Sequence, residues 1–246
     1  MKQRYIELDL LRTAAVIMMV LYHAVYDLQM IEGWDIDVFS DGWIFFARTT
    51  ASLFLLLVGC SFAISWDRHG ASHKYPKYLR RGLGLLACGM LVSLVTYMYD
   101  PETYVLFGIL HCIGVSILLL PFFARLKGWN AVVGIVMIGL GLGLGLGSGM
   151  AAHTGLFLPF GIIPPDFTTV DYFPLIPWFG VVLIGYALGY FFYVGHRSDI
   201  LRPERPRWIH TIRWMTWPGH HALLIYLLHQ PILLAILGCV GYVGFL

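Results

Sequence analysis

Residues 4–28 read RYIELDLLRTAAVIMMVLYHAVYDL, an apolar run long enough to cross a bilayer. The run nevertheless carries four ionisable side chains, Asp9, Arg12, His23 and Asp27. On one regular helix, at about 100° per residue, all four fall within about 60° of one another. The remaining faces are mainly Leu, Ile, Val, Met and Ala, so we expect this polar stripe to face the interior of a helix bundle. Ionisable groups are costly at membrane depth and tend to mark function, which makes this helix the candidate site.

The composition places the chain among polytopic membrane proteins. Of its 246 residues, 59% are hydrophobic and only 12% are charged, and the mean hydropathy is +0.74. The first apolar run is longer than that of a signal peptide and no small-residue cleavage site follows it, so we expect it to be retained. The cysteines lie in apolar runs without metal-ligand spacing, which predicts core residues rather than disulfides or a metal site. They are Cys60, Cys88, Cys112 and Cys239.

Apolar runs of about 20 residues predict an all-α transmembrane bundle of about seven spans, forming a single integral membrane domain over residues 1–246. The predicted spans are residues 8–29, 42–66, 79–99, 104–124, 129–149, 172–194 and 219–243. The apolar loop at 150–165, rich in Gly and Pro, leaves an eighth, re-entrant or interfacial, element open.

The loops alternate in charge. Lys and Arg gather before the first span and after the second, fourth and sixth, whereas the opposite loops hold only acidic charges. The positive-inside rule then puts the N-terminus in the cytoplasm and, with seven spans, the C-terminus outside. We expect a multi-pass protein of the inner (plasma) membrane.

The fifth span contains GLGLGLGSG, with glycine at every second position from Gly139 to Gly149. The alternation does not give the spacing of a dinucleotide-binding loop, and no strand precedes it. We expect faces such as Gly139 and Gly143 to allow close helix packing in lipid.

His23 is the predicted general base of the polar stripe. A carboxylate four residues on, Asp27, would fix its tautomer and stabilise the imidazolium. Asp9 and Arg12, three residues apart, form either a self-neutralising pair or a means of presenting Arg12 to an anion. The predicted catalytic residues are therefore His23, Asp27 and Arg12.

Further polar groups lie in or beside the other spans and are predicted to bind substrate. Proline two residues after His229 predicts a kink beside that histidine. The alternatives are structural, because Arg48 could simply pair with Asp27 or Asp171, and a lone histidine in a helix is more often a packing residue. The predicted substrate-binding residues are Asp9, Arg48, His111, Asp171, Trp178 and His229.

The pattern in the first helix resembles that of transmembrane acyltransferases. Leu-Asp-x-x-Arg-x-x-Ala at residues 8–15, with ten residues between Arg12 and His23, is similar to both the bacterial O-acyltransferases of surface polysaccharides and the relatives of heparan-alpha-glucosaminide N-acetyltransferase. The likeness to bacterial members of the second group covers most of the chain. It rests on FLLLVGCSFAIS at 54–65, FGILHCIG at 107–114, DYFPLIPWFGVVLIG at 171–185 and PGHHALLIYLLHQPIL at 218–233.

The resemblance implies an acyl-CoA donor, most simply acetyl-CoA, bound from the cytoplasm, and a sugar or glycan acceptor presented from the other side. Its partners would be membrane lipid, acyl-CoA and the acceptor, without nucleic acid and without a metal, and an oligomer is compatible with it. The proposed catalytic histidine of the lysosomal enzyme lies after its first helix, but residues 30–42 here contain no histidine. Direct transfer with His23 as base is therefore the preferred reading.

Basic cytoplasmic loops would supply a positive field for the phosphates of CoA, with Arg80 and Arg81 as the named candidates, although such loops also serve topology and lipid contact. Two other functions use the same buried groups. A small transporter would relay protons or bind a solute through them, but the two halves show no convincing internal repeat. A structural subunit would use them only to join helices, which does not account for their gathering in one stripe.

Overall fold

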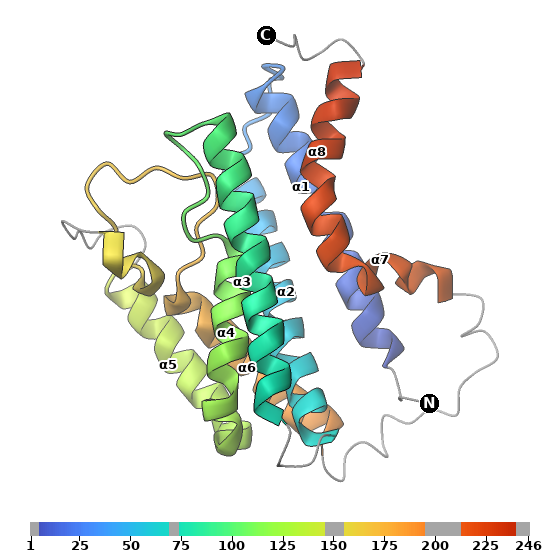
Figure 1. The fold of residues 1–246 in the computed structure, drawn as a ribbon, viewed down its shortest axis with the longest axis vertical. Helices are drawn as coiled ribbons and strands as arrows, with labels where there is room; N and C mark the ends of the chain where they lie inside the picture. Colours follow the sequence, from blue (N-terminus) through green and yellow to red (C-terminus); the bar gives the residue numbers. More distant parts are fainter. Residues whose placement is uncertain (1–4, 69–73, 146–154, 195–212, 240–246) are drawn as a thin grey trace. The chain divides into compact units, whose positions relative to one another are not determined.

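The computed structural model describes residues 5–68, 74–145, 155–194 and 213–239, and its regular elements in these ranges are helices (Figure 1). The long helices are α1 (Ile6–Met30), α2 (Asp41–Arg68), α3 (Lys74–Tyr99), α4 (Ile109–Phe123), α5 (Asn130–Gly143), α6 (Leu175–Tyr193) and α8 (Ala222–Cys239). The short ones are η2 (Ala124–Trp129), η3 (Gly155–Phe160), η6 (Arg213–Thr216) and α7 (Trp217–His220). The predicted all-α class is confirmed.

Six candidate membrane spans occur in the described ranges, and the fourth, Ile109–Gly143, contains both α4 and α5. Between these helices Lys127 has a φ of 50°, which breaks the helix at η2. The side-chain amide of Asn130 closes the turn by donating to the carbonyl oxygens of Phe123 and Lys127, at 3.0 and 2.9 Å. Within the described residues the protein thus has six apolar helical stretches, one of which is broken into two helices at η2.

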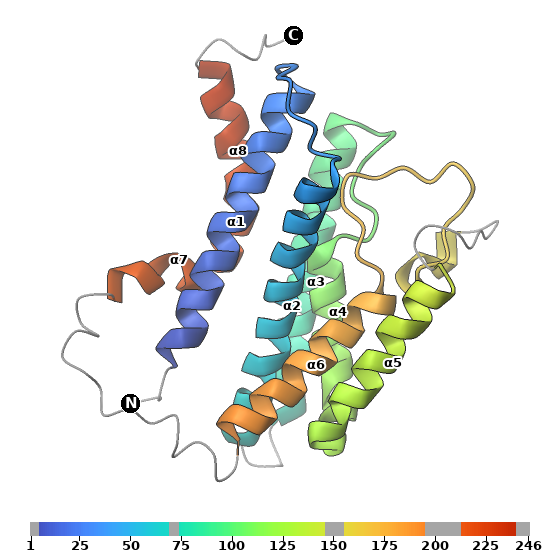
Figure 2. The same cartoon turned by 180° about the vertical axis from the view of Figure 1, so that it is seen from behind.

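The directions of α1 and α8 support seven crossings. The first turns of α1 contact Gly219 and His220, just before α8, whereas the last turns of α1 contact residues within α8, so the two helices are parallel. Both views show them side by side (Figure 2). Parallel first and last spans require an odd number of crossings between them, which five helices, α2 to α6, provide.

The chain divides into two compact units, and each is described by itself. The first comprises residues up to Phe54 and from Glu204 onward, which bring together α1, the start of α2, α7 and α8. The second, Leu55–Pro203, holds the rest of α2 and the helices up to α6. The expectation of a single functional domain over residues 1–246 stays a prediction.

Glycines allow close packing in the second unit, but not at the predicted positions. A Cβ on Gly180 would lie 2.6 Å from the carbonyl oxygen of Gly134, so α5 and α6 meet backbone to backbone. Gly141 likewise faces Pro177 of α6. The expectation for Gly139 and Gly143 is wrong, because nothing lies within 4 Å of a Cβ placed on either. Helix α5 contacts α6 through the face that carries Gly134 and Gly141.

The fourth and sixth predicted spans begin too early. Residues 102–107 and 168–173 are instead non-helical segments that lie beside each other in the second unit. The N–H of Val170 donates to the carbonyl oxygen of Thr103, and the N–H of Phe173 donates to that of Phe107, both at 2.9 Å. These residues therefore form two loops that are hydrogen-bonded to each other.

Other predictions on the later part of the chain have mixed outcomes. Helix α8 continues through Pro231 as one element, and the end of the fifth predicted span, residues 146–149, lies outside the described ranges. In the described part of the 150–165 loop, residues 155–165, the one helical element is the short η3 helix. None of the four cysteines forms a disulfide; Cys60 and Cys112 are buried in the core, whereas Cys239 is exposed.

Candidate functional site

The predicted polar stripe is carried by one unbroken helix, α1, as the sequence pattern required. Its apolar neighbours Ala15, Val16 and Met19 are buried, and its polar residues meet α7 and α8 within the first unit. The stripe therefore faces protein at both of its ends, which is the expected setting for ionisable groups in a membrane.

Asp9 organises the beginning of the stripe. Its Oδ1 accepts a hydrogen bond from the Arg12 guanidinium at 2.7 Å, and its Oδ2 accepts one from Nε2 of His220 at 3.0 Å. The Asp9–Arg12 pair is thus present, and the predicted self-neutralising arrangement is observed. Because the side chain of Arg12 is 26% exposed, its guanidinium keeps an accessible surface.

Helix α7 is hydrogen-bonded to the N-terminal end of α1. The Thr13 hydroxyl donates to the carbonyl oxygen of Asp9 and accepts from the N–H of Gly219, both at 3.0 Å. A Cβ on Gly219 would lie 2.9 Å from the Thr13 oxygen, so only glycine fits. The absence of a side chain at Gly219 is what lets His220 reach Asp9.

About two turns before the end of α1, His23 is oriented by its own helix. Its Nδ1 lies 2.9 Å from the carbonyl oxygen of Met19. A carbonyl can only accept, so Nδ1 carries the proton in the neutral ring and Nε2 carries the lone pair. That tautomer suits a base.

The predicted orienting role of Asp27 is wrong in this geometry. The carboxylate of Asp27 accepts a hydrogen bond from Nε2 of Gln230 on α8, at 2.8 Å, and His23 is held by Met19 instead. The His23 ring hydrogen-bonds to a backbone carbonyl one turn earlier in α1, and the carboxylate of Asp27 hydrogen-bonds to a side-chain amide on α8. Asp27 is only 2% exposed, and its second oxygen has no partner.

His229 of α8 lies against His23. The ring centroids are 4.7 Å apart, with an edge-to-face angle of 75°. Nδ1 of His229 is 2.6 Å from the carbonyl oxygen of Tyr226, which makes it a donor as well. Nε2 of His229 is buried without a partner. The two imidazoles thus present lone pairs rather than protons at their Nε2 atoms.

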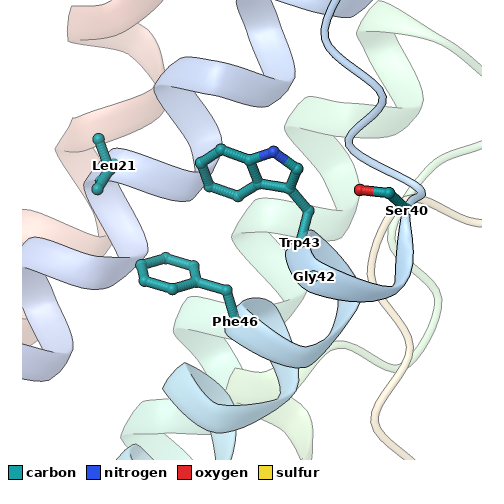
Figure 3. A pocket seen from close by; sticks show the side chains of 5 residues that line it. All are labelled: Leu21, Ser40, Gly42, Trp43 and Phe46. Atoms are coloured by element: carbon teal, nitrogen blue, oxygen red, sulfur yellow. The ribbon is translucent and has the colours of Figure 1, made fainter.

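Two other features of the first unit lie apart from this polar face. Arg48 is exposed on α2 and does not pair with Asp27, so that alternative is excluded. An open apolar pocket of about 370 Å³ is lined by Leu21, Ser40, Gly42, Trp43 and Phe46 (Figure 3). Leu21 is two residues before His23, about 200° around α1, so this pocket opens on the far side of the helix from the polar stripe.

Asp171 belongs to the second unit, where it caps α4. Its carboxylate accepts the N–H of Ile109 at 3.0 Å, on the loop just before the span that α6 forms. Burial raises the pKa of Asp171 to about 6, and the hydrogen bond from Ile109 opposes this only in part. Asp171 therefore has a structural task, and its predicted contact with substrate stays a prediction.

The other predicted residues of the second unit are His111, Trp178, Arg80 and Arg81. The His111 ring is 5% exposed, stacks on Phe107 with centroids 5.7 Å apart, and has no hydrogen-bond partner at either nitrogen. Trp178 packs on Phe173, with ring centroids 4.8 Å apart. Arg80 and Arg81 are exposed near the start of α3. Their roles in substrate or CoA binding remain predictions.

Sequence reasoning missed four residues of the polar face: Thr13, Gly219, His220 and Gln230. The sequence motif PGHHALLIYLLHQP contained three of them, but only the spatial pairing of α7 and α8 with α1 shows their role. Among the described residues, no group of three or more His, Cys, Asp or Glu side chains is arranged to hold a metal ion.

The fold and this face together define a multi-pass membrane protein with a polar helix-helix site. The sequence model of the family "Heparan-alpha-glucosaminide N-acetyltransferase, catalytic" matches residues 4–231. The chain belongs to this family, which is one of membrane acetyltransferases. Comparisons with curated proteins and with solved structures gave no match. The match begins before α1 and ends at Pro231 in α8, so it includes every residue of the polar face.

Proposed function

We propose that the protein transfers an acyl group, most simply acetyl, from acyl-CoA to a hydroxyl or amine of an acceptor such as a sugar. His23 is the general base. The observation that carries this is the hydrogen bond between His23 Nδ1 and the Met19 carbonyl oxygen, which leaves the Nε2 lone pair available beside His229. Membership of an acetyltransferase family supports the reaction type.

In the proposed step, Nε2 of His23 accepts the proton of the acceptor O–H or N–H as its heteroatom attacks the thioester carbonyl carbon. The carbon–sulfur bond breaks, and the CoA thiolate leaves and takes up the proton. The Asp9, Arg12 and His220 cluster lies at the opposite end of α1, where a partly exposed guanidinium favours an anionic group such as a CoA phosphate. Arg80 and Arg81 are proposed to add to the positive field.

We further propose that the donor enters from the cytoplasm and the acceptor from the outside. The support is the charge asymmetry of the loops, which favours a cytoplasmic position for the Asp9 end of α1. Transfer would then be vectorial across the inner (plasma) membrane.

The test is acyl transfer in sealed vesicles of known orientation, with labelled acetyl-CoA supplied on one side at a time. Acetyl-CoA on the cytoplasmic face should support transfer, and His23→Ala should lower the rate by about 10²- to 10⁴-fold, the usual contribution of a general base. His221→Ala is the matched control, because His221 is exposed and bonds only within its own turn, to Trp217 O at 3.0 Å. Undiminished transfer in folded His23→Ala protein would refute the role of His23.

A further inference from the structure

Three hydrogen-bond acceptors are buried without donors where α1 meets α8. They are Oδ2 of Asp27, Oε1 of Gln230 and Nε2 of His229. Asp27 is 2% exposed and His229 is 8% exposed, so bulk solvent does not satisfy these atoms. A buried polar atom without a partner is destabilising, and such atoms are few in folded proteins. Three together on one helix interface indicate a site that a ligand completes.

Whether each of these atoms donates or accepts a hydrogen bond is determined by the bond that the other polar atom of the same side chain makes. A carboxylate cannot donate, so the Gln230 amide must turn its nitrogen to Asp27 and its oxygen away. In the same way, the Tyr226 carbonyl oxygen holds the proton on Nδ1 of His229 and leaves a lone pair at Nε2. The face therefore offers acceptors, and its ligand must bring donors.

These acceptors form two groups along the helices. Nε2 of His229 forms one group together with Nε2 of His23, whose ring centroid lies 4.7 Å from that of His229. Asp27 and Gln230, joined at 2.8 Å, form the other. His23 and Asp27 are four residues apart on α1, which separates the two groups by about 6 Å along the helix axis.

We propose that this face binds one molecule through two non-adjacent hydrogen-bond donors, one at the histidine pair and the other at Asp27 and Gln230. The ligand class is a polyol, sugar or amino polyol with O–H or N–H groups about one helical turn apart. A molecule with a single donor leaves one group of acceptors unsatisfied, so Asp27 and Gln230 determine specificity. Only the identification of this ligand as the acyl acceptor, with its reacting group at His23, rests on the proposed function.

The first arm of the test measures binding without acyl-CoA. The probes are trans-1,4-cyclohexanediol, with hydroxyls across the ring, its isomer trans-1,2-cyclohexanediol, with adjacent hydroxyls, and cyclohexanol. Thermal stabilisation of the purified protein should show an apparent affinity for the 1,4-diol about 10-fold or more above that for the other two, because a site built to pair with polar groups discriminates against ligands that lack them. Equal affinities for all three probes would overturn the proposal.

Asp27→Asn is the most informative variant. The new amide can still accept from Gln230 through its oxygen, so the contact between α1 and α8 is kept, but it places a donor where Oδ2 was a free acceptor. It should abolish the preference for the 1,4-diol. Asp35→Asn makes the same chemical change at an exposed loop residue and should keep the preference. Gln230→Met, which removes the second acceptor, should act like Asp27→Asn.

The second arm measures acetyl transfer from acetyl-CoA to the 1,4-diol and to cyclohexanol. Asp27→Asn and Gln230→Met should lower kcat/KM for the diol about 10-fold more than for cyclohexanol, since a purely catalytic or structural role would affect both acceptors equally. Equal losses for the two acceptors, or no losses, would overturn the proposal and leave the transferase assignment intact. Diol binding that depends on Asp27 and Gln230, without transfer to either acceptor, would support the site and refute the proposed reaction.

Discussion

The basic nitrogen of His23 is selected by a backbone atom. Because the Met19 carbonyl oxygen belongs to α1 itself, no side-chain replacement at position 19 removes it, and the tautomer persists for as long as the helix does. This differs from a triad, in which a separate carboxylate holds the imidazole. Asp27 is thereby available for a different task, pairing with Gln230.

At Asp171 the structure predicts an unusual dependence of stability on pH. Its pKa is raised to about 6, so the folded protein binds this proton more tightly than the unfolded chain does. The contribution of Asp171 to stability should be full below about pH 4, fall by about 3 kcal/mol between pH 4 and 6, and then stay level. In Asp171→Asn, whose side-chain oxygen can still accept from the Ile109 N–H, this fall should disappear and stability at pH 7 should rise.

Thermal unfolding of the purified protein between pH 4 and 7 measures this directly. The same replacement at exposed Asp35 is the control and should leave the pH profile as it is. A profile that keeps its slope in Asp171→Asn would show that another group titrates in this range.

At the residue level, the sequence predicted the helix face correctly but not all of its partners. Asp9, Arg12, His23 and Asp27 could be placed on one stripe because helical periodicity is local. The partner of Asp27 is 203 residues away, and periodicity carries no information about such a pairing. The expected Asp27–His23 bond was wrong for that reason.

At the level of elements, α5 and α6 are held together by backbone contact rather than by large side chains. In Gly180→Ala the added methyl would meet the carbonyl oxygen of Gly134, so the helices must separate. We expect a loss of about 1–3 kcal/mol, typical of overpacking, observed as a lower Tm. Gly139→Ala is the matched control on α5, because nothing lies within 4 Å of its added Cβ, and it should be neutral or slightly stabilising.

Equal Tm losses in the two variants would show that the glycines act through helix flexibility and not through packing. The sequence could not separate these positions, since glycine recurs at every second residue from Gly139 onward and any of several faces could have met a neighbour. Similarly, the pairing of residues 102–107 with 168–173 relies on backbone atoms, which leave no side-chain pattern to read.

At the scale of the whole molecule, the seven predicted crossings and the charge of the loops predict opposite sides of the membrane for two turns. Lys127 lies in the turn between α4 and α5, and Asp100 follows α3. With the N-terminus in the cytoplasm, Lys127→Cys should react with a membrane-impermeant thiol reagent only in inside-out vesicles, and Asp100→Cys only in right-side-out vesicles. A background without the four natural cysteines is the control, and labelling on the same side for both positions would contradict seven crossings.

The polar face is built by the first helix and the last long helix described, with five other long helices between them in the chain. During synthesis α1 therefore enters the bilayer well before α8 leaves the ribosome. Until then Asp27 lacks its partner Gln230, so α1 must stay in the bilayer or beside the insertion machinery with an unpaired carboxylate near its C-terminal end. Nascent chains cut short before α8 should consequently be inactive and targeted by quality-control proteases. The site thus comes into being only as one of the last steps of biogenesis.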